Sequence, residues 1–258
     1  MQLEVKTMAE LSEKNITPDF LYWVGSAGSF DDRAKKITRA FVKVLNYANV
    51  SFGVLGVEES TSGDVAKRAG NEFLFQMQAL ANIEVMNSYN IKKIITTCPH
   101  SFNILKNEYP DLGGNYEVYH HSEFVHDLIE SKKITISQNS IDEVMTYHDP
   151  CYLGRGNNIY NQPREIIKRL SKNFIEMPRN KRNSLCCGAG GAQMFKEAEK
   201  GSAEINIVRT QEALDTKSKI IVTGCPFCNT MMSDGVKNIN EVAALVKDIA
   251  EVVAESLV

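Results

Sequence analysis

The chain has 258 residues, of which 43% are hydrophobic and 24% charged, a composition typical of folded globular proteins that excludes wholesale disorder. Its 29 lysine and arginine residues nearly balance 32 aspartate and glutamate residues, and the net charge of −3 argues against binding to nucleic acid or to an anionic membrane. Because the sequence shows neither a signal peptide nor a run of about 18 apolar residues, we expect a cytoplasmic protein without a membrane span.

The first half of the chain alternates strand and helix patterns. A short apolar run predicts a strand over 20–24, and apolar residues three or four positions apart predict a helix over 33–45. A strand over 50–55, a long helix over 71–86 and a strand over 91–96 are expected next. The polar segment 128–139, which carries Ser-Lys-Lys, is the expected linker between two halves.

The second half repeats this alternation. Strands are predicted over 144–147, 174–177 and 220–222, and helices over 163–170 and 205–214, the former with Pro163 in its first turn. Strands that alternate with helices predict βαβ units and therefore mostly parallel sheets. The expected fold class is α/β, with two pseudo-symmetric lobes whose mostly parallel sheets are flanked by helices.

An internal repeat relates the two halves in three places. Ser26 and Cys151 each follow a predicted strand, Thr61-Ser62-Gly63 corresponds to Cys186-Cys187-Gly188, and Cys98-Pro-His-Ser101 corresponds to Cys225-Pro-Phe-Cys228. Ligands of open parallel sheets bind at the carboxyl ends of the strands. We therefore expect the three segments of each half to converge, giving one site per lobe.

Five of the six cysteines lie at these repeat positions in the second half: Cys151, Cys186, Cys187, Cys225 and Cys228. Without an export signal, such a set indicates metal binding or redox chemistry rather than structural disulfides. Thiolates bind both zinc and iron–sulfur clusters, but five exceed the four ligands of one zinc ion. The set therefore favours an iron–sulfur cluster over zinc and over a bare dithiol. The glycines of 188–191 allow the backbone to fold around such a group, and their spacing does not match a dinucleotide-binding loop.

The corresponding positions of the first half hold mainly neutral hydroxyls: Ser26, Thr61, Ser62, Cys98 and Ser101. Hydroxyls are poor ligands for iron or zinc beside thiolates. A first-lobe site with a single thiolate is therefore expected to hold no metal.

Other polar residues have weaker patterns. His148 is a candidate hydrogen-bond or proton donor at the metal centre, with a core histidine bonded to the backbone as the alternative. Arg155 and Arg164 are candidates for holding an anionic substrate or stabilising a reduced centre, with surface salt bridges as the alternative. His100 is equally consistent with packing and with ligation. Three further histidines, which no cysteine frames, are expected to be surface or core residues: His120, His121 and His126.

Three strings carry a family resemblance: Tyr147-His-Asp-Pro-Cys-Tyr-Leu-Gly-Arg155, Leu185-Cys-Cys-Gly-Ala-Gly-Gly191 and Cys225-Pro-Phe-Cys228. Their pattern resembles the CCG cysteine-rich domain found in the B-type subunit of heterodisulfide reductases, in lactate-utilisation iron–sulfur proteins and in an iron–sulfur component of glycerol-3-phosphate dehydrogenase. The resemblance implies two pseudo-symmetric α/β domains, each intact one with a non-cubane [4Fe–4S] cluster, although some CCG domains resemble zinc sites instead.

The resemblance implies an intact lobe over residues 140–258 and a degenerate one over residues 1–130. Close relatives resemble Trp-Val-Gly-Cys, Glu-Ser-Cys-Thr-Gly-Asp and Cys-Pro-His-Cys, where this chain has Ser26, Thr61 and Ser101 in place of cysteines. A mechanism that needs two clusters is therefore not expected.

Two functions follow from these residues. The favoured one is an iron–sulfur oxidoreductase subunit that passes electrons to a disulfide or small-molecule acceptor at the second-lobe cluster. The sequence lacks a ferredoxin cysteine run and a flavin fingerprint, so a ferredoxin-type iron–sulfur or flavoprotein partner is implied, with any membrane contact made through a partner. The competing function is a non-catalytic interaction subunit with a structural zinc in the second lobe.

Overall fold

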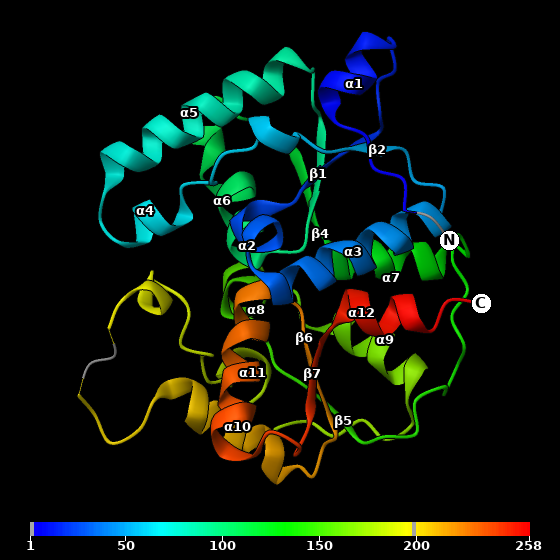
Figure 1. Ribbon diagram of the computed structural model, residues 1–258, viewed down its shortest axis with the longest axis vertical. Helices are drawn as coiled ribbons and strands as arrows, with labels where there is room; N and C mark the ends of the chain where they lie inside the picture. The colour runs from blue at the N-terminus through cyan, green and yellow to red at the C-terminus, as the bar shows by residue number, and fades with distance from the viewer. Residues whose placement is uncertain (1–2, 198–199) are drawn as a thin grey trace.

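A computed structural model describes residues 3–197 and 200–258 and confirms the α/β class (Figure 1). In this part of the chain, one parallel sheet has the strand order β2-β1-β3-β4 and a second has the order β5-β6-β7. We call the sheet of β1–β4 with its helices the first lobe, and the sheet of β5–β7 with its helices the second lobe.

The elements of the first lobe, in chain order, are α1 (Met8–Glu13), β1 (Phe20–Trp23), α2 (Gly25–Phe30), α3 (Asp32–Tyr47), β2 (Phe52–Gly53), η1 (Gly56–Glu58), α4 (Asp64–Arg68), α5 (Glu72–Ser88), β3 (Lys93–Thr96), α6 (Pro99–Asn107), η2 (Tyr109–Leu112), β4 (Glu117–His120) and α7 (His121–Glu130). Those of the second are β5 (Met145–Tyr147), α8 (Cys151–Asn157), α9 (Asn161–Leu170), η3 (Lys181–Asn183), η4 (Gln193–Phe195), α10 (Ile205–Asp215), β6 (Ile220–Thr223), α11 (Pro226–Asn240), β7 (Leu245–Asp248) and α12 (Ile249–Glu255).

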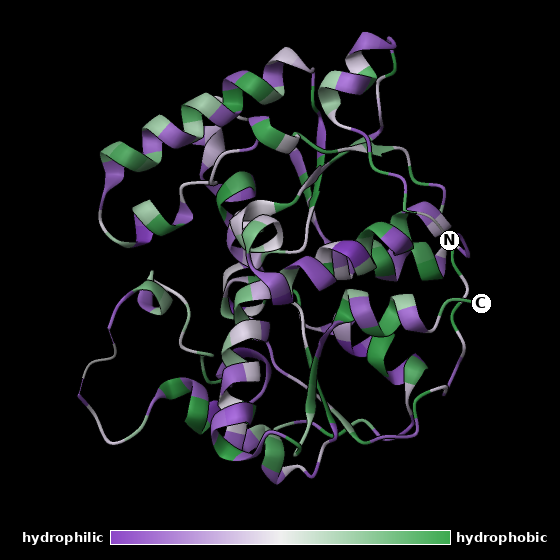
Figure 2. Cartoon of the chain, viewed as in Figure 1, coloured by the Kyte–Doolittle hydropathy of each residue, from purple (hydrophilic) through white to green (hydrophobic). Residues whose placement is uncertain are grey.

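Helix α3 shows how the sequence sets these elements. Asp31 precedes the helix and its carboxylate accepts the backbone N–H of Ala34 at 2.7 Å, which satisfies one of the free donors of the first turn. The helix buries the face that its apolar spacing predicts, including Ile37 and Phe41. Figure 2 shows the alternation of apolar and polar residues along the helices of both lobes.

The two lobes share one apolar core. It joins Tyr22 and Phe41 of the first lobe to Tyr147 and Ile249 of the second. In Figure 1, α3 and α7 of the first lobe lie beside α12 and α9 of the second. Arg33 of α3 also pairs with Glu251 of α12 at 2.6 Å. The lobes are therefore fixed against each other by burial as well as by charge.

Two expectations about these elements are wrong, one about a linker and one about a strand. The linker was placed over 128–139, but α7 continues to Glu130 and buries Leu128 and Ile129 in the shared core. The apolar spacing of α7 therefore outweighs the polar residues that follow it. The strand expected over 174–177 is only a single bridge from Phe174 to Met145. Among the described residues, no helix is both long and apolar enough to cross a membrane.

Candidate metal centre

The three cysteine segments of the second lobe lie together at the carboxyl edge of its sheet. Cys151 is the first residue of α8, shortly after β5. Cys225 precedes α11 after β6, and Cys228 lies in the first turn of α11. Cys186 and Cys187 lie on the loop between η3 and η4. This edge is where parallel sheets bind ligands.

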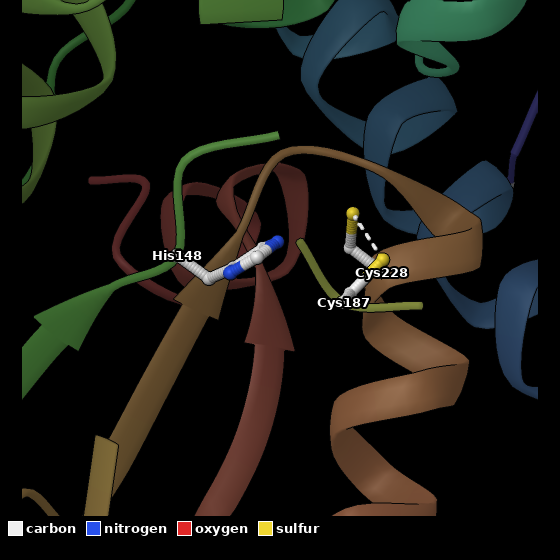
Figure 3. Close-up of side chains that lie close together, drawn as sticks. All are labelled: His148, Cys187 and Cys228. Carbon is white, nitrogen blue, oxygen red and sulfur yellow. Dashed lines mark hydrogen bonds between the residues drawn. The ribbon is translucent and has the colours of Figure 1, made fainter. Parts of the chain in front are cut away.

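The sulfurs of these segments gather around one close pair. The Sγ atoms of Cys187 and Cys228 lie 3.2 Å apart, and Figure 3 shows this pair at the start of α11. The remaining cysteines are near enough to shift one another's pKa values: Cys151 with Cys186, Cys186 with Cys187, Cys225 with Cys228, and Cys98 with Cys225. The structure thus brings the five expected thiols together and adds Cys98 from the first lobe.

This sixth thiol changes one expectation. The repeat predicts one site in each lobe, and the structure places Cys98 of the first lobe beside Cys225 of the second. The hydrogen bond with Cys225, together with burial, raises the pKa of the Cys98 thiol. The two sites are therefore neighbours, with Cys98 and Cys225 between them. No local sequence signal indicates this contact, because the repeat does not specify how the lobes face each other.

Two cysteines are prepared to be thiolates. Hydrogen bonds from Cys151 and Cys187, with a further one from the Gly188 N–H, lower the pKa of the Cys186 thiol. Burial opposes ionisation of Cys225, yet hydrogen bonds from Cys228 and Cys98 bring its pKa below the ordinary value. Metals bind cysteine as thiolate, so these two positions are the ones from which a metal displaces protons most easily.

His148 lies against the same sulfurs, at the end of β5 (Figure 3). One of its ring nitrogens and the Sγ atoms of Cys187 and Cys228 lie within 4.8 Å of one another. Its Nδ1 accepts the Nε–H of the buried Arg209 at 3.0 Å, so the neutral ring carries its proton on Nε2. Burial and the charge of Arg209 lower the pKa of His148 to about 4. Its Nε2 has no partner among the described residues and is free to donate to a sulfur or a cluster.

The two candidate arginines have structural partners. Arg164 is buried and forms a bidentate pair with Asp149 at 2.7 and 2.8 Å, and it also pairs with Glu176. Arg155 donates to the backbone oxygen of Ser184 at 2.6 Å, next to the Cys186-Cys187 loop. The Arg164 guanidinium is fully engaged and is not arranged to hold an anionic substrate, whereas Arg155 is exposed and uses only its Nη1. They fix the loops that carry the cysteines.

The sequence reasoning missed Arg209. It is fully buried on α10 and, besides His148, donates to the Ser184 hydroxyl at 3.1 Å and to Glu212 at 2.9 Å. It therefore ties the strand end that carries His148 to the loop that carries Cys186 and Cys187. A lone arginine in a helical pattern gives no local signal of such a role.

The donor set fits a metal centre. Five free thiols at one sheet edge, three of them buried, match the ligand chemistry of an iron–sulfur cluster or zinc. Gly188 has φ of +93°, a backbone conformation that favours glycine, and its N–H reaches Cys186 Sγ at 3.3 Å. The apolar side chains of Met194, Phe227 and Met231 pack against the cysteines and limit the access of water.

The first-lobe counterparts also converge. All five line a single cavity: Ser26, Thr61, Ser62, Cys98 and Ser101. His100 lines it as well, and its Nδ1 lies 2.9 Å from Asp64. Among the described residues of this cavity, Cys98 is the only thiol. The cavity therefore has the positions of a cysteine site without its ligands.

The remaining histidines are bonded within the protein. His121 is fully buried with its Nε2 2.8 Å from Asp248, and the buried His120 has its Nδ1 2.7 Å from the Ser122 hydroxyl. His126 Nε2 lies 2.6 Å from Glu165. These contacts agree with the expectation of core and surface histidines, and none of the three is part of the sulfur centre.

The fold and the site define a two-lobed cysteine-rich α/β protein with one thiol-lined centre. Residues 21–106 and 145–233 both match the family model of the CCG cysteine-rich domain. The chain therefore belongs to the CCG cysteine-rich domain family, with two copies of the domain, as the cysteine strings indicate.

Named relatives carry this domain within longer chains. The protein is 44% identical over 257 residues to the Bacillus subtilis "Probable iron-sulfur-binding oxidoreductase FadF", covering 98% of this chain and 36% of that one. It is 45% identical over 246 residues to the Syntrophomonas wolfei "EtfAB:quinone oxidoreductase", covering 93% and 34%. It is 32% identical over 250 residues to one subunit of the dihydromethanophenazine:CoB--CoM heterodisulfide reductase of Methanosarcina barkeri, covering 93% and 59%. The chain thus spans about a third of the length of the first two relatives.

Proposed function

We propose that this protein is an iron–sulfur redox subunit that passes electrons to a disulfide or small-molecule acceptor. The observation that carries the proposal is the convergence of five thiols at the carboxyl edge of the second-lobe sheet, where the Sγ atoms of Cys187 and Cys228 lie 3.2 Å apart. The names of the relatives, two oxidoreductases and part of a heterodisulfide reductase, support it.

The cofactor in this proposal is a [4Fe–4S] cluster held by Cys151, Cys186, Cys187, Cys225 and Cys228. A zinc ion needs four ligands and would leave one of these thiols unused, whereas a cluster has several irons to bind them. The family resemblance favours the non-cubane form. The cluster supplies the one-electron chemistry, and the protein's own groups hold it, exclude water and tune it.

His148 is the principal tuning group in this proposal. Its Nε2–H is directed by the Arg209 bond to Nδ1 and is available to the sulfurs of Cys187 and Cys228. A hydrogen bond to a ligand sulfur stabilises the reduced, more negative centre. Asp149 and Arg164 keep this strand end in place through their buried ion pair.

We further propose that residues 140–258 form the intact lobe and residues 1–130 a degenerate one. Electrons then enter from a ferredoxin-type iron–sulfur or flavoprotein partner, in keeping with the oxidoreductase names of the longer relatives. A cytoplasmic location, where thiols stay reduced, suits the six free cysteines.

The test is reduction of the anaerobically purified, iron-loaded protein, followed by bleaching of its visible absorption. We expect a reduced ferredoxin or flavoprotein to bleach the chain and NADH alone to leave it unchanged. A Cys225→Ser variant should show no absorption to bleach. Robust NADH-linked turnover by the single chain would contradict the need for a partner. A colourless protein with about one zinc would favour the interaction subunit with a structural metal instead.

A further inference from the structure

The first-lobe cavity is large enough to hold a small molecule. Its volume is about 400 Å³, within the range of protein sites that bind such molecules. Its polar wall is formed by the hydroxyls of Ser26, Thr61, Ser62 and Ser101, and Cys98 lies beside them. Hydroxyls bind metals poorly but form good hydrogen bonds to neutral oxygen atoms. The cavity is therefore better suited to an organic molecule than to a metal.

The opposite wall is aromatic and comes from the second lobe. Phe227, which lies between Cys225 and Cys228, meets the ring of His100 edge to face with centroids 5.7 Å apart. Phe195 meets Phe227 in the same way at 6.5 Å. Met194 completes this side. Aromatic side chains arranged in this way favour a flat ring, which can stack on one of them and meet the edge of another.

The charges of the cavity disfavour an ionic occupant. The described residues that line it include neither lysine nor arginine, so an anion would find no countercharge. Its two carboxylates are already engaged: Asp31 caps α3, and Asp64 pairs with Arg68 and His100. A cation would therefore also lack a free partner. A neutral molecule satisfies the hydroxyls without a buried unpaired charge.

Two aromatic side chains that line the cavity are exposed to solvent. Phe30 is 82% exposed and Phe195 is 64% exposed, although both line the cavity. Exposed apolar residues that surround a concave site are typical of binding sites, because a ligand buries them on entry. Phe30 comes from the first lobe and Phe195 from the second, so an occupant would contact both lobes.

We propose that this cavity binds an uncharged, flat aromatic molecule with one or two hydrogen-bonding oxygens on its ring. The hydroxyls of the polar wall form hydrogen bonds with those oxygens. Phe195, Phe227 and His100 pack against the ring. This inference goes beyond the proposed function, because it assigns a ligand to the lobe that lacks the cysteine set. The ligand would lie next to Cys98, which is a neighbour of Cys225 in the sulfur centre.

The test uses duroquinone, a fully methylated benzoquinone whose ring has no free position for thiol addition. Equilibrium dialysis under anaerobic conditions, with the metal-loaded and oxidised protein, measures its binding directly and independently of electron transfer. We expect saturable binding of one molecule per chain. The matched charged probe is tetramethylterephthalate, which has the same methylated ring but carries two carboxylates, and we expect it to bind at least about tenfold more weakly.

Three variants locate the binding. Ser26 is exposed on α2, so Ser26→Phe should fold while filling the cavity. Phe195→Ala removes part of the aromatic wall. Phe195→Ala should weaken duroquinone binding about tenfold, the value of one lost aromatic contact, and Ser26→Phe should weaken it at least as much because its ring occupies the ligand's space. Ser29→Phe is the control, since Ser29 is exposed on the same helix and is not one of the lining residues. Absence of saturable binding, unchanged binding in Ser26→Phe, or equal binding of the dicarboxylate would overturn the proposal.

Discussion

The thiol of Cys98 in the first lobe lies beside that of Cys225 in the second, and this neighbour together with burial raises the pKa of Cys98. Both residues occupy the same place in the internal repeat, each at the start of a helix that follows a central strand. The contact connects a lobe with a single cysteine to the one that holds five. The first lobe is therefore placed to influence the metal centre of the second.

Replacement of Cys98 tests this influence. In Cys98→Ala we expect the iron content to stay unchanged, because the second lobe supplies five thiols of its own. The reduction potential should fall by about 40 mV, since removing one hydrogen bond of about 1 kcal/mol destabilises the reduced centre. Potentiometric titration measures the shift, and Cys98→Ser, which keeps a donor, should lie closer to the unmodified protein. An iron loss as severe as that of a ligand variant would show that Cys98 is itself a ligand.

The repeat offers a matched pair for the ligand assignment. Cys228 and Ser101 stand at equivalent positions of the two lobes, each in the first turn of its helix. Cys228→Ser should abolish or strongly reduce iron incorporation, because a hydroxyl replaces a thiolate. Ser101→Ala should leave iron unchanged. Metal analysis of the two folded variants checks this, and equal iron in both would contradict the assignment of the centre to the second lobe.

Much of the site could be predicted because its signals are local. Each cysteine segment follows a strand, and the repeat marks the same three loops in both halves, so convergence at one sheet edge follows from parallel-sheet geometry. The buried face of α3 was likewise predicted from its apolar spacing.

The parts that were missed depend on tertiary contacts. The packing of Cys98 on Cys225 depends on how the lobes face each other, which no spacing within one lobe encodes. Arg209 reaches His148 from α10, 61 positions further along the chain. Leu128 belongs to α7 because the shared core covers it, although the segment that follows is polar.

Restoring the first-lobe cysteines tests whether this lobe has the geometry of a lost metal site. The triple variant Ser26→Cys, Thr61→Cys and Ser101→Cys places three new thiols in the cavity that already contains Cys98. Four thiolates are enough in number for a cluster, so iron per chain should rise by about one cluster's worth after reconstitution. The variant should also lose duroquinone binding, because the cavity is then occupied. A folded triple variant with the iron content of its parent would refute the inference.

Glu59 gives a pH dependence that is separate from the metal. Its carboxylate accepts the N–H groups of Val24 at 3.0 Å and Gly25 at 2.6 Å, but burial raises its pKa to about 7 from an ordinary value of 4.5. The unfolded chain therefore loses this proton at lower pH than the folded protein. Folding stability should fall as pH rises from about 4.5 to about 7, by about 3 kcal/mol in total.

Glu59→Gln removes this titration. Urea unfolding at about pH 5.5 and about pH 7.5 should show that the unmodified protein loses about 2 kcal/mol more than the variant over this interval. The exposed Glu84 provides the control, and Glu84→Gln should behave like the unmodified protein. An equal loss of unfolding free energy in the Glu59→Gln variant would mean that the Glu59 carboxyl has its ordinary pKa in the folded protein.

The central claim is that the second-lobe thiols hold an iron–sulfur cluster, and the most direct measurement is metal and sulfide analysis of the anaerobically purified protein. The account predicts a brown protein with about four iron and about four acid-labile sulfide per chain. The Cys228→Ser variant, prepared in parallel, should lack both. A colourless protein with about one zinc and no sulfide would contradict the account.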